Sequence, residues 1–161
     1  LNWLNSQVIH EMSPEILLKK LEPLFKAKGW ELPSQTWGKD LAELIGPSMV
    51  LLNDGVKEAL PFFEDPILQA DGKKQLEIEN AKTALKFILE ELKQIDCSLL
   101  KKNQALDLIN KTIKECHVKK GLVMKSLRAA LLGTLSGPDL IKSWILLSRL
   151  SNDRTRISRF I

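Results

Sequence analysis

The stretch Ser126–Ile141, SLRAALLGTLSGPDLI, places one arginine inside a run of small and aliphatic residues and then breaks into Gly, Ser, Gly and Pro. Ser126 to Leu132 has the spacing of a short helix, which Gly133 ends because glycine readily adopts the left-handed conformation that closes helices. The segment Ser136–Asp139, SGPD, combines the capping residues and the proline that commonly begin a helix. The stretch therefore predicts two helices that meet at a corner, with Arg128 one turn away from it.

This corner has the chemistry of a site for a phosphate or for the edge of a nucleic-acid base. The first N–H groups of a helix attract anions, glycine permits close approach, and a guanidinium forms paired hydrogen bonds with planar acceptors. The alternative is a buried Arg128 that donates hydrogen bonds to carbonyl groups at the helix ends within the protein. The residues alone leave both possibilities open.

The rest of the chain has helical spacing, without a long alternation of apolar and polar residues, so we expect an all-α protein built from helical bundles. The first expected helix runs from Ser13-Pro14 to Gly29, is kinked at Pro23 and has an apolar face of Ile16, Leu17, Leu21, Leu24 and Phe25. The next runs from a Ser34 cap to Gly46-Pro47, and two short helices are expected within 48–63. A long helix over 73–96 and another from about Lys102 to Cys116 follow, and the helix after the SGPD segment is expected to bury Leu140, Ile141, Trp144, Ile145 and Leu147.

A turn-rich link from Glu64 to Gly72 divides the chain into expected subdomains 1–72 and 73–161. Charge is divided too: residues 1–92 hold 10 Lys and Arg against 15 Asp and Glu, whereas residues 93–161 hold 14 against 5, within a net charge of +4. A basic half of this kind favours an anionic partner, nucleic acid first and a membrane surface second. Lysines that serve only solvation are the alternative.

The cysteines and histidines predict neither a disulfide framework nor a metal site. Cys97 and Cys116 lack zinc-site spacing, which favours a reducing, cytoplasmic setting, and Cys116 falls on the apolar stripe of its helix. His10 and His117 lie far apart in the sequence, so surface or capping roles are expected for them. No apolar run is long enough for a membrane span.

Two segments resemble the C-terminal, anticodon-binding region of bacterial or organellar glutamyl-tRNA synthetases, which are class I aminoacyl-tRNA synthetases. LNWLNSQVIHEMSPEIL is similar to the family's K-L-x-W-x-N-x-x-Y-I-R segment, with Val8 and His10 at the usual Tyr and Arg positions. LRAALLGTLSGPDL is similar to the more specific motif L-R-x-A-L-T-G-x-x-x-x-P-x-L, with Leu132 in place of Thr. The resemblance covers nearly the whole chain.

The resemblance implies a two-part α-helical cage that holds the anticodon stem and loop of tRNA(Glu). The family activates glutamate with ATP and Mg²⁺ and transfers it to tRNA in a Rossmann catalytic domain, whose HIGH-like and KMSKS-like signatures do not occur in this sequence. We therefore expect the catalytic domain, with ATP and Mg²⁺, upstream of Leu1. This chain is expected to carry no catalytic residue, cofactor or metal, and the segment Leu1–Asn5 with Trp3 is expected to pack against that domain.

The resemblance also implies roles for individual residues. The family's contacts to the last two anticodon bases match Arg128, Gly137, Pro138 and Leu140, with Lys125 beside them. Asn110 matches a contact that is basic in some members, which leaves Lys111 as its expected substitute. Phosphate contacts are expected from a basic face formed by Lys101, Lys102, Lys111, Lys119 and Lys120.

The turn containing Pro47 and Ser48 matches the place where members that charge only glutamate tRNAs tend to carry an arginine for the third anticodon base. Ser48 stands there in this sequence, and its hydroxyl can donate or accept a hydrogen bond, so relaxed specificity that includes tRNA(Gln) is expected. The alternative is that Gly46-Pro47 ends one helix and Ser48 caps the next.

Two other classes of function are considered. A helical scaffold could bind a partner protein through an apolar groove and use its lysines only for solubility. An enzyme active by itself is disfavoured, because no nucleophile–base pair, metal cluster or phosphate-binding glycine loop has recognisable spacing.

Overall fold

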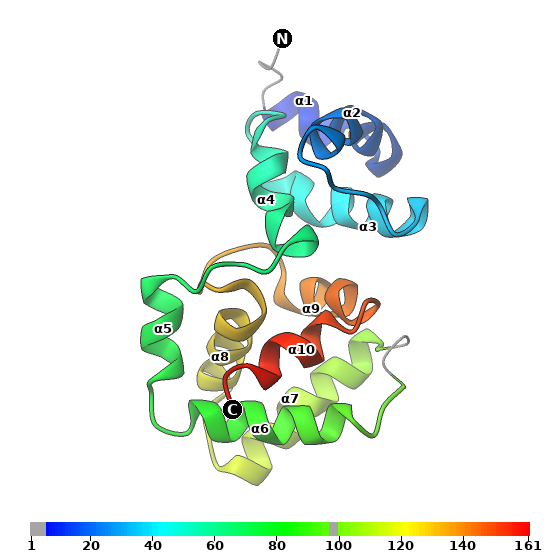
Figure 1. Cartoon of the computed structure of the whole chain (residues 1–161). Coiled ribbons are helices and arrows are strands. Elements are labelled where there is room, and N and C mark those ends of the chain that lie inside the picture. The colour runs from blue at the N-terminus through cyan, green and yellow to red at the C-terminus, as the bar shows by residue number, and fades with distance from the viewer. Residues whose placement is uncertain (1–5, 97–99) are drawn as a thin grey trace. The chain divides into compact units, whose positions relative to one another are not determined.

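The computed structural model describes residues 6–96 and 100–161, and these residues form helices and turns without a strand (Figure 1). The all-α prediction is confirmed. The chain divides into two compact units, Leu1–Asp65 and Pro66–Ile161. The sequence placed the division at residue 72, which instead lies inside a helix, because the turn-rich link ends before Ala70.

The first unit contains α1 (Ser6–Glu11), α2 (Pro14–Ala27), α3 (Gln35–Ile45), the 3-10 helix η1 (Gly46–Ser48) and α4 (Asp54–Phe63). Both expected N-caps are confirmed: the Ser13 hydroxyl accepts from the Ile16 amide at 3.3 Å and the Ser34 hydroxyl from the Trp37 amide at 3.1 Å. These bonds satisfy backbone donors that a helix start otherwise leaves open.

Two details of the first unit differ from expectation. Ile16 is 50% exposed, and Leu18 takes its place in the core, because the buried face of α2 lies slightly further round the helix. Residues 48–63 contain one α-helix, α4, and not two, because Asp54 accepts the Val50 and Leu51 amides and closes the segment before the helix into a turn.

A cluster of aromatic rings forms one part of the core of the first unit. The rings of Trp30 and Phe63 are stacked with centroids 4.9 Å apart, and Phe25 and Trp37 contact Phe63 at an angle. The indole nitrogen of Trp30 donates to the Glu64 carboxylate at 2.7 Å, which joins the segment after α2 to the end of α4. The core and this polar contact together hold the helices of the unit.

The second unit contains α5 (Ala70–Leu76), α6 (Ala81–Leu92), α7 (Lys102–Cys116), α8 (Lys120–Leu132), α9 (Leu140–Ser148) and α10 (Asn152–Ser158). Its central helix is α8, which contacts α5, α6, α7, α9 and α10 (Figure 1). The helix is accordingly small and apolar on most sides, with Val123, Ser126, Leu127, Ala129, Ala130, Leu131 and Leu132 buried.

The boundaries in the second unit differ from expectation in three places. The expected long helix over 73–96 is two helices, because Asn80 adopts a left-handed conformation (φ 72°), which asparagine tolerates better than most residues. Helix α8 begins at Lys120 and not at Ser126. The sequence analysis also missed the short helix α10.

Polar side chains of α10 attach it to three neighbouring segments. The Asp153 carboxylate accepts from the Trp144 indole at 3.0 Å on α9, Arg154 donates to the Ile95 carbonyl at 2.6 Å, and Arg156 donates to the Leu131 carbonyl at 2.7 Å. The second carboxylate oxygen of Asp153 is buried without a hydrogen-bond partner among the described residues. Burial raises the pKa of Asp153 above its ordinary value of 3.8.

This raised pKa predicts that Asp153→Asn stabilises the protein at neutral pH. The folded protein holds the Asp153 proton more tightly than the unfolded chain, so the resulting stability is present below about pH 4 and is lost as pH rises through the folded-state pKa. Asparagine can still accept from Trp144 without a buried charge. Urea unfolding followed by tryptophan fluorescence should show the free energy of unfolding of wild type falling relative to that of Asp153→Asn between acid and neutral pH.

The matched control is Asp153→Ala, which removes the charge and the acceptor together. It should be about 1–3 kcal/mol less stable than Asp153→Asn, because the Trp144 N–H is then buried without a partner. Parallel pH profiles for wild type and Asp153→Asn would contradict the assignment.

The turn after α8 passes very close to the segment that precedes α5. Gly133 has φ 79°, and a Cβ atom there would lie 2.6 Å from the Ile67 carbonyl oxygen. Its own carbonyl accepts from the Gln69 amide at 2.8 Å and would lie 2.6 Å from a Cβ at Gly72. Backbone thus meets backbone where only glycine fits.

We expect Gly133→Ala to lower the free energy of unfolding by at least ~1–3 kcal/mol, from conformational strain and from this contact. Gly121→Ala is the control, since Gly121 lies in α8 and a Cβ there meets no atom within 4 Å. It should be neutral or stabilising by up to ~1 kcal/mol. Equal denaturation midpoints for Gly133→Ala and wild type would refute the close packing.

Candidate nucleic-acid interface

The expected corner exists between α8 and α9. Gly133 ends α8 in the left-handed conformation, as predicted. The N-cap of α9 is Asp139, whose carboxylate accepts the Lys142 amide at 2.9 Å, and not Ser136. Pro138 therefore lies just before the N-cap and not in the first turn of α9. Its ring fixes the backbone φ angle in the extended segment that leads into the helix.

Arg128 lies half-buried at this corner. One guanidinium nitrogen donates to the Pro138 carbonyl at 2.8 Å, and a Cβ atom at Gly137 would be 3.7 Å from the same nitrogen. This hydrogen bond, to a carbonyl next to the start of α9, is the kind expected if Arg128 has a purely structural role. It occupies one of five N–H donors and is the only hydrogen bond of the guanidinium to the described residues. The same bond orients the remaining donors.

The other residues expected at the corner differ in exposure. Lys125 and Gly137 are exposed and Pro138 is half-buried, so these three are accessible beside Arg128. Leu140 is only 3% exposed, so its side chain belongs to the core beneath the corner. The structure thus brings Arg128, Gly137 and Pro138 into direct proximity, with Lys125 one helical turn before Arg128.

Asp71 holds the start of the corner loop in place, and the sequence analysis did not identify it. Its carboxylate accepts from the Thr134 hydroxyl at 2.8 Å and from the Leu135 amide at 3.0 Å. These hydrogen bonds, first that of the Leu135 amide, lower the pKa of Asp71. Because the partners are more than 60 residues apart in the chain, no local pattern marks this contact.

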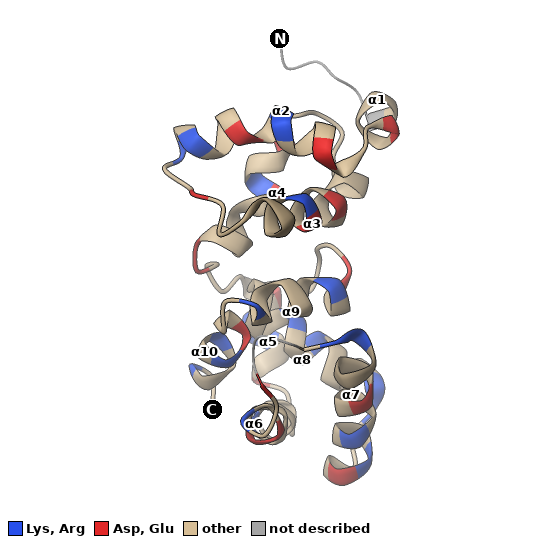
Figure 2. Ribbon diagram, turned by 90° about the vertical axis from the view of Figure 1, so that its right-hand side faces the viewer, with Lys and Arg blue, Asp and Glu red and all other residues tan. Residues whose placement is uncertain are grey.

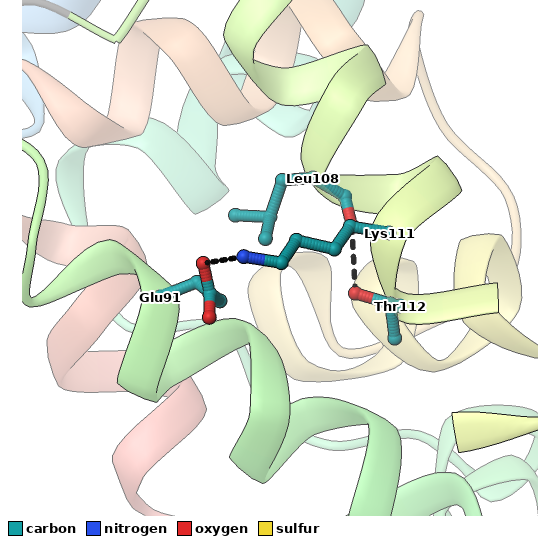
Figure 3. Close-up of polar contacts among 4 residues, drawn as sticks. All are labelled: Glu91, Leu108, Lys111 and Thr112. Carbon is teal, nitrogen blue, oxygen red and sulfur yellow. Dashed lines mark hydrogen bonds and ion pairs between the residues drawn. The ribbon is translucent and has the colours of Figure 1, made fainter. Parts of the chain in front are cut away.

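The expected basic face is exposed in the second unit, and Figure 2 shows Lys and Arg positions along α7 and at the start of α8. One member is paired: the Lys111 ammonium lies 2.9 Å from the Glu91 carboxylate, while Thr112 on the same helix turns inward and donates to the Leu108 carbonyl at 2.7 Å (Figure 3). Asn110 is exposed beside Lys111. All members of the face are exposed, namely Lys101, Lys102, Lys111, Lys119 and Lys120.

Pro47 and Ser48 are exposed in η1 of the first unit, whereas Gly46 is buried. Gly46-Pro47 ends α3 as the alternative expected, but the next helix begins only at Asp54, so the expectation that Ser48 caps it was wrong. The Ser48 side chain is therefore accessible in a short rigid turn that follows α3.

The described residues include both histidines and Cys116. Cys116 is half-buried on α7, where burial raises the pKa of its thiol. His10 is exposed, and His117 is the C-cap of α7 with φ 55°, which confirms surface and capping roles. Cys97 and the segment 1–5 with Trp3 lie outside the described residues.

Within the described ranges, no three His, Cys, Asp or Glu side chains are grouped so as to hold a metal ion. No helix in the described part of the chain is long and apolar enough to cross a membrane.

Comparison with known proteins matches residues 16–161 to the family model of the anticodon binding domain. The chain is 68% identical over its full length to a glutamate–tRNA ligase of Prochlorococcus marinus, of which it covers 34%, and 50% identical over 99% of its length to one of Synechococcus, of which it covers 33%. It spans about a third of the length of these curated relatives.

The fold agrees with these matches. A crystal structure of a glutamate tRNA ligase from Elizabethkingia meningosepticum superposes with a TM-score of 0.85 at 20% identity, covering 98% of this chain and 31% of that one. With the family model matching almost the entire sequence, this chain belongs to the anticodon-binding domain family.

Proposed function

We propose that this chain is the part of a glutamate–tRNA ligase that binds the anticodon arm of tRNA(Glu). The observation that carries the proposal is the guanidinium of Arg128, fixed by Pro138 at an accessible corner with its other donors uncommitted among the described residues. Bases of a single-stranded loop can be splayed out and bonded along their pairing edges by such a group. Glutamate–tRNA ligases at up to 68% identity over the whole chain support the same assignment.

The residues of the corner have different roles in the proposed RNA recognition. Arg128 reads the edge of the second anticodon base, and the third base is left to Ser48. Gly137 and Pro138 present backbone and a compact apolar ring to the bases. Leu140 supports the corner from the core. The exposed lysines bind phosphates, which contributes affinity without reading sequence.

In this proposal, catalysis takes place in another domain of the ligase. ATP and Mg²⁺ act in a catalytic domain outside this chain, where glutamate is activated and transferred to the tRNA. The chain supplies the recognition that selects which tRNA is charged.

We expect Arg128→Ala to weaken binding of an RNA hairpin with the glutamate anticodon by about 1–3 kcal/mol, the range for a lost bidentate base contact. Arg128→Lys should restore little, because an ammonium lacks the planar fork. Fluorescence anisotropy with matched and anticodon-altered hairpins measures both affinity and discrimination, and the variant should lose discrimination.

Lys86→Ala, at an exposed position on α6, is the control and should leave discrimination unchanged. If Arg128→Ala lowers the melting temperature but binds both hairpins as wild type does, the bond to Pro138 is the whole role of Arg128. A wild-type affinity that does not fall as salt rises would instead favour the protein-binding scaffold.

We further propose relaxed specificity at the third anticodon base, which would allow charging of tRNA(Gln) as well as tRNA(Glu). Ser48 is accessible in η1, and its hydroxyl can serve either as donor or as acceptor. Glutamate and glutamine anticodons end in C and G, which present different edges. A hydroxyl accommodates both, whereas an arginine would favour one of them.

The wild-type chain should therefore bind hairpins whose anticodons end in C or in G with affinities within about tenfold of each other. Ser48→Arg should create a preference, while Ser48→Ala should not. A wild-type preference above about a hundredfold, or ~2.7 kcal/mol, would mean that residues other than Ser48 discriminate.

A further inference from the structure

A cleft of about 420 Å³ lies within the second unit, between the turn that joins α5 to α6 and the turn that joins α7 to α8. Its volume is within the range of ~300–1,000 Å³ that small-ligand sites occupy. The residues that line it are Gln75, Ile78, Asn80, His117, Val118, Lys119, Gly121, Leu122 and Lys125. Neither the corner nor the proposed roles of its residues account for this cleft.

The cleft has apolar walls together with cationic groups. Ile78 is 48% exposed, and Val118 and Leu122 are half-buried. Lys119 and Lys125 are exposed, and neither ammonium has an ion pair or hydrogen bond with a described residue. Apolar surface beside unpaired cations matches a nucleotide, whose base is flat and largely apolar and whose phosphate is anionic.

The absence of acidic residues from the lining distinguishes this cleft from three other clefts in the described chain. One other cleft is lined by Glu22 and Glu31, another by Glu43 and a third by Glu91 and Asp107, and such carboxylates repel phosphate. Glu77 and Glu79 flank Ile78 in the sequence, but neither is among the lining residues.

The floor of the cleft is fixed. Gln75 is only 5% exposed, and its amide nitrogen donates to the Ser126 hydroxyl at 3.2 Å, which joins α5 to α8 beneath the opening. Asn80 and His117, on opposite turns, both hold left-handed backbone conformations. The walls are therefore set by helix ends and not by long loops.

Lys125 connects the cleft to the corner. It lies three residues before Arg128 on α8, so the two side chains leave the helix on neighbouring positions about 4.5 Å apart along its axis. We propose that the cleft is a second RNA subsite, which holds one unstacked nucleotide of the loop adjacent to the bases at Arg128. Ile78, Val118 and Leu122 contact the base, and Lys119 and Lys125 contact its phosphate. This inference rests on the proposed function, because the nucleotide belongs to the same RNA loop.

The first test fills the cleft without removing a charge. Gly121 lines the cleft and a Cβ atom there meets no atom within 4 Å, so the leucine of Gly121→Leu can be accommodated and narrows the opening. We expect it to weaken binding of the glutamate anticodon hairpin roughly tenfold or more, because a nucleotide excluded from the cleft loses its apolar contacts. Its melting temperature should stay the same or rise, since glycine is the poorer helix former. Gly121→Ala is the matched control and should bind within about twofold of wild type.

The second test identifies the nucleotide. Hairpins that lack one base at a time are titrated against wild type, Ile78→Ala and the control Leu106→Ala, an exposed apolar position on α7. At one loop position, loss of the base should weaken wild type by roughly fivefold or more and weaken Ile78→Ala far less, because both changes remove the same contact. Leu106→Ala should respond as wild type does.

The results separate the subsite from the proposed function. The subsite is overturned if Gly121→Leu binds the hairpin as wild type does. It is also overturned if removal of each base weakens binding of Ile78→Ala as much as it weakens binding of wild type. In both cases, discrimination between anticodons by wild type would still support the proposed function. If wild type does not bind the hairpin, the proposed function fails and the subsite fails with it.

Discussion

The burial of α8 is the constraint on which the second unit depends. This helix contacts every other helix of the unit, so its surface must be small and apolar on nearly all sides. Leucines and alanines at the contact positions meet that demand, and a charged side chain can emerge only where no helix covers it. Lys125 and Arg128 emerge there, three residues apart, which places them on neighbouring positions of the one helix whose own position all the others fix.

Support for the corner follows from how the C-terminal end of α8 is held. The Leu131 carbonyl accepts from Arg156, Gly133 fits against the backbone near Ile67, and Asp71 holds the following turn through Thr134 and Leu135. The Arg156 contact satisfies a carbonyl that the end of a helix leaves open, and the contacts come from two parts of the chain, α10 and the segment that contains Ile67 and Asp71. The guanidinium of Arg128 is thus oriented by a carbonyl that is itself held in a constrained loop, and such preorganisation lowers the ordering cost of binding.

The features that the sequence predicted correctly are local. The caps at Ser13 and Ser34 and the stop at Gly133 depend on residues within one turn, so spacing and residue type were sufficient to predict them. The break at Asn80 was missed because asparagine occurs both in helix interiors and in left-handed turns. The residue type alone does not distinguish these two conformations. Helix α10 and the role of Asp71 were missed for a different reason: their partners are distant in the sequence, and a single sequence carries no signal for such contacts.

The same distinction applies to charge. The sequence showed an excess of lysines in the second half, but only the structure separates Lys111, which is paired with Glu91, from Lys119 and Lys125, whose ammonium groups have no carboxylate partner among the described residues. An exposed pair of this kind contributes little to stability, yet it offsets the local field that attracts phosphate. Net charge therefore indicates that an anion will be attracted to this unit, whereas the positions of carboxylates determine where it will stay. The acid-free cleft and the corner, which both include residues of α8, are the places where positive charge and fixed polar geometry occur together, as the proposed RNA binding requires.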